Sequence, residues 1–172
     1  MNIIIEGPNG TGKTTFINKL LACKEFENYN VEHLTASCPN DYEFHKRLLL
    51  NDNTIFDRFF IGEMVYPKIY KRAFKISTHE IQQLCNDFAD STIIVFIDAD
   101  YGFICDSLKK RGEEIDMNFI DTEKQLFNEA VDSLKNIKIY KIKHHATGCL
   151  YGSEKSDDYY INKIRNDYTE MK

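Results

Sequence analysis

The sequence predicts one α/β domain with a five-stranded parallel sheet flanked by helices. Three observations lead to this prediction. Short apolar runs alternate with segments of helical periodicity along the chain. The run at residues 92–97 is almost continuously apolar, which is typical of a central parallel strand that is covered on both faces. A glycine-rich turn at residues 7–12 joins the first apolar run directly to the first helical segment.

Length and composition agree with a single domain covering residues 1–172. Hydrophobic residues make up 42% and charged residues 28% of the chain, and we find no internal repeat or linker. The net charge of −5 argues against a broad nucleic-acid-binding surface, so no stable nucleic-acid partner is expected. No apolar stretch is long enough to cross a membrane, and Met1 leads straight into a strand, which leaves no room for a signal peptide. The five scattered cysteines indicate free thiols and a cytoplasmic location: Cys23, Cys38, Cys85, Cys105 and Cys149.

The first half of the chain predicts three strands, at residues 2–6, 31–35 and 54–56. Helical patterns cover residues 13–23, 42–50 and 61–72. We expect Pro67 to kink or interrupt the last of these helices, because proline lacks the backbone N–H that a helix interior uses.

The second half predicts strands at residues 92–97 and 137–142. Ser77 and Glu80 have the spacing of a capping box, and Asp100 is placed to cap the helix that follows it. Further helices are expected at about residues 120–134 and 159–168, with a charged break at 109–114 and a loop at 144–156. In parallel sheets ligands bind at the carboxyl ends of the strands. The turn at 7–14, Asp57-Arg58, Asp98 and the loop after Ile142 should therefore meet at one cleft.

The turn itself has the pattern G-x-x-x-x-G-K-[ST] between a strand and a helix. Its glycines allow the backbone N–H groups to surround a phosphate at the positive end of the following helix. Lys13 would supply positive charge to the β- and γ-phosphates, and the Thr14 hydroxyl would bind Mg²⁺. The motif predicts ATP or GTP binding by Gly7, Asn9, Gly10, Thr11, Gly12, Lys13, Thr14 and Thr15.

Asp57 and Arg58 directly follow a buried strand, where a charged pair needs a partner. Arg58 offers a planar fork for a phosphate or a base, and Asp57 suits Mg²⁺ or a proton. The alternative interpretation is a local ion pair at the strand end. The basic cluster at 109–114 similarly predicts either a mobile loop whose Arg111 closes over the phosphates or a solvated helix end.

Aromatic residues are concentrated between residues 44 and 74, and most of them are expected in the core. Phe44, Phe59 and Tyr66 are the best candidates for stacking on a nucleobase. His144, His145 and Cys149 lack the spacing of a metal site, so we interpret them as ordinary loop residues near the nucleotide.

Three stretches together resemble the thymidylate kinases and the related deoxynucleoside kinases. Residues 5–15 look like their P-loop, Asp57-Arg58-Phe59 with Tyr66 looks like their Asp-Arg-aromatic motif, and residues 98–114 resemble their strand, helix and arginine-bearing lid. The run at 57–66 is also similar to small kinase-like proteins of large phages.

This resemblance implies the three-layer P-loop kinase fold, with a short lid at about 109–118. It also implies transfer of the γ-phosphoryl group of ATP, with Mg²⁺, to a deoxynucleotide or deoxynucleoside. Lys13, Asp57, Arg58 and Arg111 would be catalytic, Thr14 and Asp57 would hold the metal, and Phe44, Arg58, Phe59 and Tyr66 would bind the acceptor. Related kinases are commonly dimers, so a homodimer is compatible with the resemblance, although no surface stripe in the sequence indicates one.

The chain departs from this family at the acceptor. Residues 34–41 contain neither the Arg-Glu-Pro-Gly-Gly-type loop of thymidylate kinases nor the basic Glu of deoxynucleoside kinases, and Gly62 and Pro67 replace the usual Ser and Gln. An acceptor phosphate is already ionised and needs no general base, which favours a monophosphate acceptor such as dTMP. The alternatives are a deoxynucleoside with Asp57 or Asp41 as base, a modified base in DNA, or an ATP- or GTP-binding module without an acceptor.

Overall fold

The computed structural model describes residues 1–146 and 155–170. The strands are β1 (Asn2–Glu6), β2 (Asn30–His33), β3 (Thr54–Asp57), β4 (Thr92–Ala99) and β5 (Lys138–His144). The helices are α1 (Lys13–Leu21), α2 (Tyr42–Leu49), α3 (Ile61–Tyr70), α4 (Thr78–Asp87), α5 (Tyr101–Lys110), α6 (Met117–Ser133) and α7 (Asp157–Glu170).

The strands form one parallel sheet in the order β2-β3-β1-β4-β5, which confirms the predicted architecture. β1 lies in the middle, and Ile3, Ile4 and Ile5 are fully buried. β-branched side chains suit such a position because they pack well on a pleated surface that is covered on both sides.

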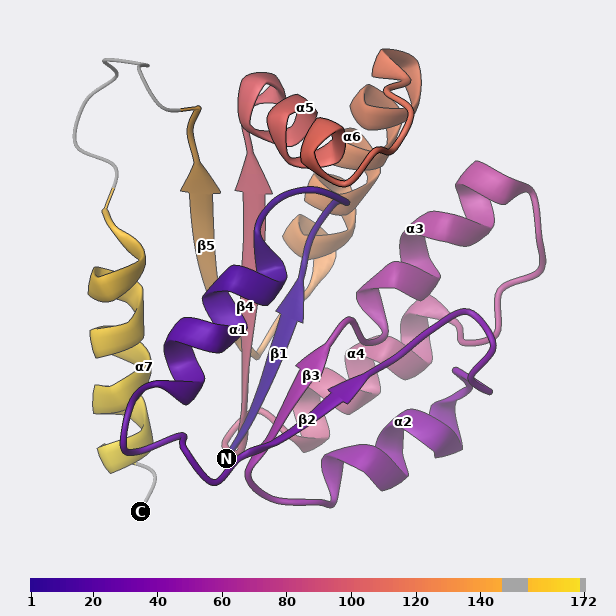
Figure 1. Cartoon of the computed structure of the whole chain (residues 1–172). Helices are drawn as coiled ribbons and strands as arrows, with labels where there is room; N and C mark the ends of the chain where they lie inside the picture. The colour runs from indigo at the N-terminus through magenta and orange to yellow at the C-terminus, as the bar shows by residue number, and fades with distance from the viewer. Residues whose placement is uncertain (147–154, 171–172) are drawn as a thin grey trace.

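Side chains alternate between the two faces of the sheet and produce two separate cores. On one face Ile4, Phe56 and Ile94 pack against α2, α3, α4 and α6. On the other face Ile3, Ile5 and Val95 pack against α1 and α7. Figure 1 shows the resulting three layers, with α1 and α7 on the near side of the sheet and α4 and α6 behind it.

The carboxyl ends of the strands lie at the upper edge of the sheet in Figure 1, together with the loop that follows β1. α5 lies above this edge, where Ile104 and Leu108 form a small third core with Ala99 and Ile120. The segments that were predicted to share a cleft are therefore brought to the same end of the molecule.

Helix starts agree with the predicted caps. Ser77 and Glu80 form the reciprocal bonds of a capping box, and the Asp100 carboxylate accepts from the Phe103 N–H at 2.8 Å. α6 begins at Met117, before the predicted residue 120, because Asp116 caps it. Since α5 extends to Lys110, the loop between the two helices covers residues 111–116 and is shorter than the predicted segment 109–118.

Two other predictions needed correction. α3 continues through Pro67, which is near its C-terminal end, and the Arg72 N–H bonds back to the Pro67 carbonyl. His144 belongs to β5 rather than to a loop, because it pairs with Ala99 in register.

In the part of the chain that the structure describes, no helix is long and apolar enough to span a membrane. Cys23, Cys38, Cys85 and Cys105 are free thiols, as predicted. Cys149 and much of the predicted loop 144–156 lie outside the described residues.

Candidate functional site

The loop between β1 and α1 requires glycine for steric reasons. Gly7 has φ +144°, and a Cβ there would lie 2.1 Å from the Ile97 carbonyl oxygen. Gly12 has φ +94°, and a Cβ there would lie 2.9 Å from Nδ1 of His144. Neither position accepts another side chain, so the loop is held in a conformation that brings its backbone against β4 and β5.

Lys13 is the first residue of α1, and its side chain is buried within the loop. Its ammonium group donates to the carbonyl oxygens of Gly7 at 2.7 Å and Pro8 at 2.6 Å. Burial and the neighbouring Arg58 guanidinium lower the pKa of Lys13. A bound phosphate would favour the charged form of this amine.

His144 supports the same loop from β5. Its Nδ1 lies 2.8 Å from the Thr11 carbonyl oxygen, and its Nε2 lies 2.8 Å from Oδ1 of Asp157 on α7. Burial alone would lower the pKa of His144, but the bonds to Asp157 and Thr11 raise it overall. The hydrogen bond to His144 is the main reason that the pKa of Asp157 falls to about 2. His144, which the sequence analysis placed in a loop near the nucleotide, therefore supports the backbone of the loop between β1 and α1.

A cavity of about 660 Å³ opens above this loop. It is lined by residues 9–15, His33, Asp57, Arg58, Phe103, Asp106, Ser107, Lys110, Arg111, His145 and Ala146. We call it the nucleotide cavity. It brings together Lys13, Asp57, Arg58 and Arg111, which are far apart in sequence, and its size is in the range that holds small-molecule ligands.

Asp57 and Arg58 have different surroundings although they are neighbours. Asp57 ends β3, and its Oδ2 lies 3.0 Å from Nδ1 of His33 on β2. Arg58 has φ +71°, a left-handed conformation that is uncommon for a residue with a side chain, and its N–H donates to the Ile5 carbonyl at 3.0 Å. Asp57 thus has a local partner at the strand end, as the alternative interpretation expected, but this partner is His33 and not Arg58.

A second cavity, of about 270 Å³, adjoins the first. It is lined by Asn9, Leu34, Thr35, Ala36, Asn40, Arg58, Phe59, Gly62, Glu63, Tyr66, Tyr70, Arg72, Phe119 and Glu123. We call it the acceptor cavity, after the role that is proposed for it below. Arg58 and Asn9 line both cavities.

Two of the three aromatic residues singled out in the sequence, Phe59 and Tyr66, line the acceptor cavity. Phe44 does not. It lies on α2, where its ring packs edge-on to His45 and beneath the Arg47 guanidinium. α2 thus directs this ring to the protein's own side chains instead of the cavity.

Glu123 on α6 is a site residue that the sequence analysis missed. Its side chain is 2% exposed, its Oε2 accepts from the Asn9 N–H at 3.1 Å, and its Oε1 accepts from the Tyr66 hydroxyl at 2.8 Å. Burial, followed by this carboxylate, raises the pKa of Tyr66. The available signal was a carboxylate on the apolar face of a helix, between Ile120 and Phe127.

Glu6 was also missed, and it is the carboxylate beneath the Asp57-Arg58 turn. One of its oxygens accepts from the N–H groups of Phe59 at 2.7 Å, Ile61 at 3.1 Å and Gly62 at 3.3 Å. Burial raises the pKa of Glu6, while these hydrogen bonds oppose that shift. Glu6 therefore links the end of β1 to the start of α3, next to Arg58.

The loop at 111–116 lies at the entrance to the site. Arg111 is half exposed, and its Nε lies 3.0 Å from Oε1 of Glu113. The other oxygen of Glu113 accepts from the Asn9 side chain at 3.3 Å. Apart from Glu113, Arg111 has no ion-pair partner among the described residues, and it lines the nucleotide cavity.

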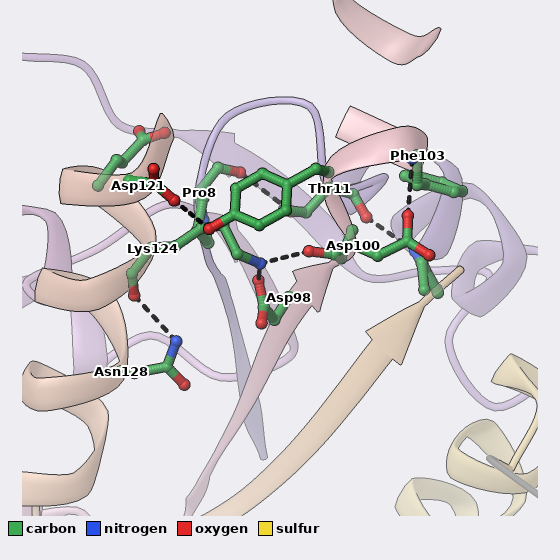
Figure 2. A network of polar contacts seen from close by, with 12 residues as sticks. Pro8, Thr11, Asp98, Asp100, Phe103, Asp121, Lys124 and Asn128 are labelled. Carbon is green, nitrogen blue, oxygen red and sulfur yellow. Dashed lines mark hydrogen bonds and ion pairs between the residues drawn. The ribbon is translucent and has the colours of Figure 1, made fainter. Parts of the chain in front are cut away.

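Asp98 was predicted to face the same cleft, but it lines neither cavity. Figure 2 shows the reason: Lys124 on α6 donates to the Asp98 carboxylate and to the Ala99 carbonyl. Beside this pair the Tyr101 hydroxyl bonds to Asp121, and Asp100 caps α5 at Phe103. This network joins the end of β4 to α5 and α6.

The residues of the nucleotide cavity suit Mg²⁺. Thr14 is exposed and lines the cavity together with Asp57. Thr14 provides a hydroxyl oxygen, and Asp57 provides a carboxylate oxygen. Mg²⁺ takes one or two such protein ligands and completes its shell with phosphate oxygens and water. Within the described residues no group of three or more His, Cys, Asp or Glu side chains could hold a metal, and Cys149 lies outside them.

No protein-family model matches the chain. The SPβ prophage-derived uncharacterized protein YorR of Bacillus subtilis (strain 168) is 27% identical over 135 residues, which are 76% of this chain and 82% of YorR. The crystal structure of YorR in complex with phosphorylated GDP superimposes with a TM-score of 0.78 at 24% identity, covering 96% of this chain and 94% of YorR.

Two kinds of kinase structure are also similar. Deoxyadenosine kinase from M. mycoides with bound dCTP gives a TM-score of 0.60 at 16% identity, covering 99% of this chain and all of that one. This chain has the P-loop kinase fold. A protein described as putative polyphosphate kinase 2, from Pseudomonas aeruginosa PA01, gives a TM-score of 0.68 at 14% identity, and the match covers 99% of this chain but 41% of that one. The P-loop kinase fold was the expectation from sequence, and it is confirmed.

Proposed function

We propose that this protein transfers the γ-phosphoryl group of ATP to a deoxynucleoside monophosphate. The observation that carries the proposal is the pair of adjoining cavities, one built on the P-loop and the other lined by aromatic rings, with Arg58 common to both. Such an arrangement suits a donor and an acceptor that meet at one cationic side chain.

In this proposal the P-loop holds the donor through its backbone N–H groups and Lys13. Thr14 and Asp57 would hold Mg²⁺, which would supply positive charge to the donor phosphates. Arg58 positions the acceptor phosphate, and Arg111 turns inward from the loop at 111–116. Phosphoryl transfer needs little covalent chemistry from the protein, so positioning and charge neutralisation account for most of the catalysis.

The state of the carboxylates favours a monophosphate over a nucleoside acceptor. A 5′-hydroxyl needs a general base, and the two carboxylates of the acceptor cavity are already engaged. Glu123 accepts from Asn9 and Tyr66, and Glu63 is paired with Arg72. A phosphate acceptor needs a cation instead, and Arg58 lies at the junction of the two cavities.

A deoxynucleoside acceptor is the second candidate. It is favoured by the similarity to deoxyadenosine kinase and by Asp57, which lines the nucleotide cavity beside His33 and could serve as base. The crystal complex of YorR with phosphorylated GDP supports a nucleotide ligand for this chain as well, and makes GTP a donor to test beside ATP.

The deciding experiment measures nucleoside triphosphate consumption with Mg²⁺ against a panel of deoxynucleosides and their monophosphates. Turnover with a monophosphate supports the proposal. Turnover with nucleosides alone would replace it with the second candidate. ATP binding without turnover on any acceptor would indicate a nucleotide-binding module.

Lys13→Ala is expected to lower turnover by at least about 100-fold, because it removes the cation held beside the donor phosphates. The melting temperature should stay near that of the wild type. Lys24→Ala, which removes an exposed lysine outside both cavities, is the matched control. Near-normal turnover in Lys13→Ala would contradict the proposed donor site.

A further inference from the structure

The acceptor cavity contains a polar cluster for which phosphoryl transfer has no use. The Glu63 carboxylate pairs with both terminal nitrogens of Arg72, with both N···O distances at 2.9 Å. The Asn40 amide donates to Oε1 of Glu63 at 3.3 Å. Glu63 and Asn40 are each 4% exposed, and all three residues line the acceptor cavity but not the nucleotide cavity.

The hydrogen-bonding capacity of this cluster is only partly used. A carboxylate has about four acceptor positions, and Arg72 and Asn40 occupy three of those of Glu63. One position on Oε2 remains open. The amide hydrogens of Asn40 go to Glu63 and to the Thr35 carbonyl at 2.9 Å, which leaves its Oδ1 as an acceptor within the described part of the chain.

Arg72 keeps donors of its own. Its Nη1 also donates to the Ala73 carbonyl at 3.4 Å, while its Nε–H and the second Nη2–H have no partner among the described residues. The cluster therefore presents two acceptors, on Glu63 and Asn40, beside the donors of a guanidinium that cannot lose its charge.

The Watson–Crick edges of the four bases differ in how many donors they offer to such a cluster. Guanine places two neighbouring donors, N1–H and the N2 amino group, beside the O6 acceptor. Adenine, cytosine and thymine each place one donor group on this edge. An arginine also binds O6 and N7 of guanine in a bidentate manner. Two acceptors and a guanidinium thus match guanine more fully than any other base.

We propose that Glu63, Asn40 and Arg72 select guanine as the base of the acceptor, so that the substrate is a deoxyguanosine nucleotide. This inference rests on the proposed function, because it requires the acceptor to occupy this cavity. Phe59, Tyr70 and Phe119 line the same cavity, and aromatic side chains suit contact with a planar base.

Unmodified enzyme provides the first test. The kcat/KM values of dGMP, dAMP, dCMP and dTMP are compared with that of dIMP, which has the purine of dGMP without the N2 amino group. dGMP should be the best acceptor, and dIMP should be lower by about tenfold or more. The corresponding nucleosides are run in parallel, since base selection does not depend on the phosphate.

Variants provide the second test. Glu63→Gln and the double variant Glu63→Gln/Arg72→Gln should remove the preference for dGMP over dIMP. The double variant removes both charges together, so no buried charge is left unpaired if the single variant folds poorly. Glu27→Gln, an exposed carboxylate outside both cavities, is the control.

The outcomes separate the two proposals. Turnover that is fastest with dTMP, or equal for dGMP and dIMP, overturns guanine selection and leaves the kinase function standing. A uniform loss with every base in the Glu63 variants shows a purely structural ion pair and also overturns it. If no acceptor is phosphorylated, the proposed function fails. Calorimetric binding of dGMP against dIMP then decides base selection, with equal affinity as the negative result.

Discussion

Arg58 lines both cavities, and its position depends on an unusual backbone conformation. A left-handed residue with a side chain costs on the order of 1 kcal/mol, and such strain persists only where the surroundings enforce it. Here the Arg58 N–H donates to the Ile5 carbonyl, and Glu6 accepts from the N–H groups of three of the next four residues. The turn after β3 is therefore held in place by hydrogen bonds to β1, the strand that leads into the P-loop.

Buried carboxylates are the other residue-scale feature of the site. Glu6, Glu63 and Glu123 are each at most 4% exposed. Each is matched to particular donors: backbone N–H groups for Glu6, a guanidinium for Glu63, and an N–H with a hydroxyl for Glu123. A buried charge without such partners would be strongly destabilising, so these pairings constrain the positions of α3 and α6 relative to the P-loop.

The burial of His45 on α2 leads us to expect that the protein becomes less stable in acid. It is fully buried against Phe59, Nδ1 lies 3.0 Å from the Asp41 carbonyl, and Nε2 has no hydrogen-bond partner. Burial lowers the pKa of His45 to about 4, below the usual value of 6.5. The unfolded chain then binds the proton more readily, so this contribution is complete above pH 6.5 and is lost as the pH falls toward 4.

The effect amounts to at most about 3 kcal/mol in the free energy of unfolding. Urea denaturation of the wild type and of His45→Leu between pH 7 and 4 measures it. The variant should lose less stability than the wild type over this range. His79→Gln, which removes an exposed histidine, should follow the wild type. Parallel curves for His45→Leu and the wild type would show that His45 is not the acid-sensitive group.

At the scale of elements, four helices begin at a side chain that caps them. Asp41, Ser77, Asp100 and Asp116 each accept from backbone N–H groups in the first turn. The Asp116 cap determines where α6 begins, and so where the loop at 111–116 ends. Local sequence thereby sets one end of the proposed lid.

Ser77→Ala is expected to destabilise the protein by about 1 kcal/mol, because it removes the hydroxyl that accepts from the Glu80 N–H in the α4 capping box. Such a change lowers the melting temperature by about 2–4 °C in a domain of this size. Thr78→Ala, at the adjacent exposed residue, is the matched control. An unchanged melting temperature in Ser77→Ala would mean that α4 is held by packing alone.

At the scale of the whole molecule, the order β2-β3-β1-β4-β5 brings the ends of all five strands to one edge. β1 leads into the P-loop, β3 carries Asp57, and β5 carries His144, which supports the P-loop at Thr11. A ligand in the nucleotide cavity would contact several of these segments at once. Binding should therefore stabilise the whole fold and not only the loop.

ATP with Mg²⁺ at 100 times its dissociation constant should add about 2.7 kcal/mol to the free energy of unfolding. The melting temperature should rise by several degrees, at about 2–4 °C per kcal/mol. Replacing Mg²⁺ with EDTA should reduce the shift, since Thr14 and Asp57 are proposed to hold the ion. An equal shift in EDTA would contradict the metal site, and no shift in either buffer would contradict the nucleotide cavity.

Sequence by itself determined the features that depend on neighbours along the chain. Apolar periodicity identified all five strands of the sheet, and the glycine and lysine spacing identified the P-loop. The helix caps at Ser77 and Asp100 were also predicted correctly, because a capping side chain bonds to a residue only three positions away. These signals are local, and local hydrogen bonding and periodicity are what a sequence displays directly.

Only the tertiary structure decided which distant side chains share a cavity. Glu123 meets Asn9, Arg72 meets Glu63 and Asn40, and Lys124 removes Asp98 from the cleft. Phe44 and Phe59 looked equivalent in sequence, and only Phe59 lines the acceptor cavity. Such pairings follow from how α2, α3 and α6 pack on one face of the sheet. The burial that makes them strong is a property of the assembled fold, which no stretch of sequence contains.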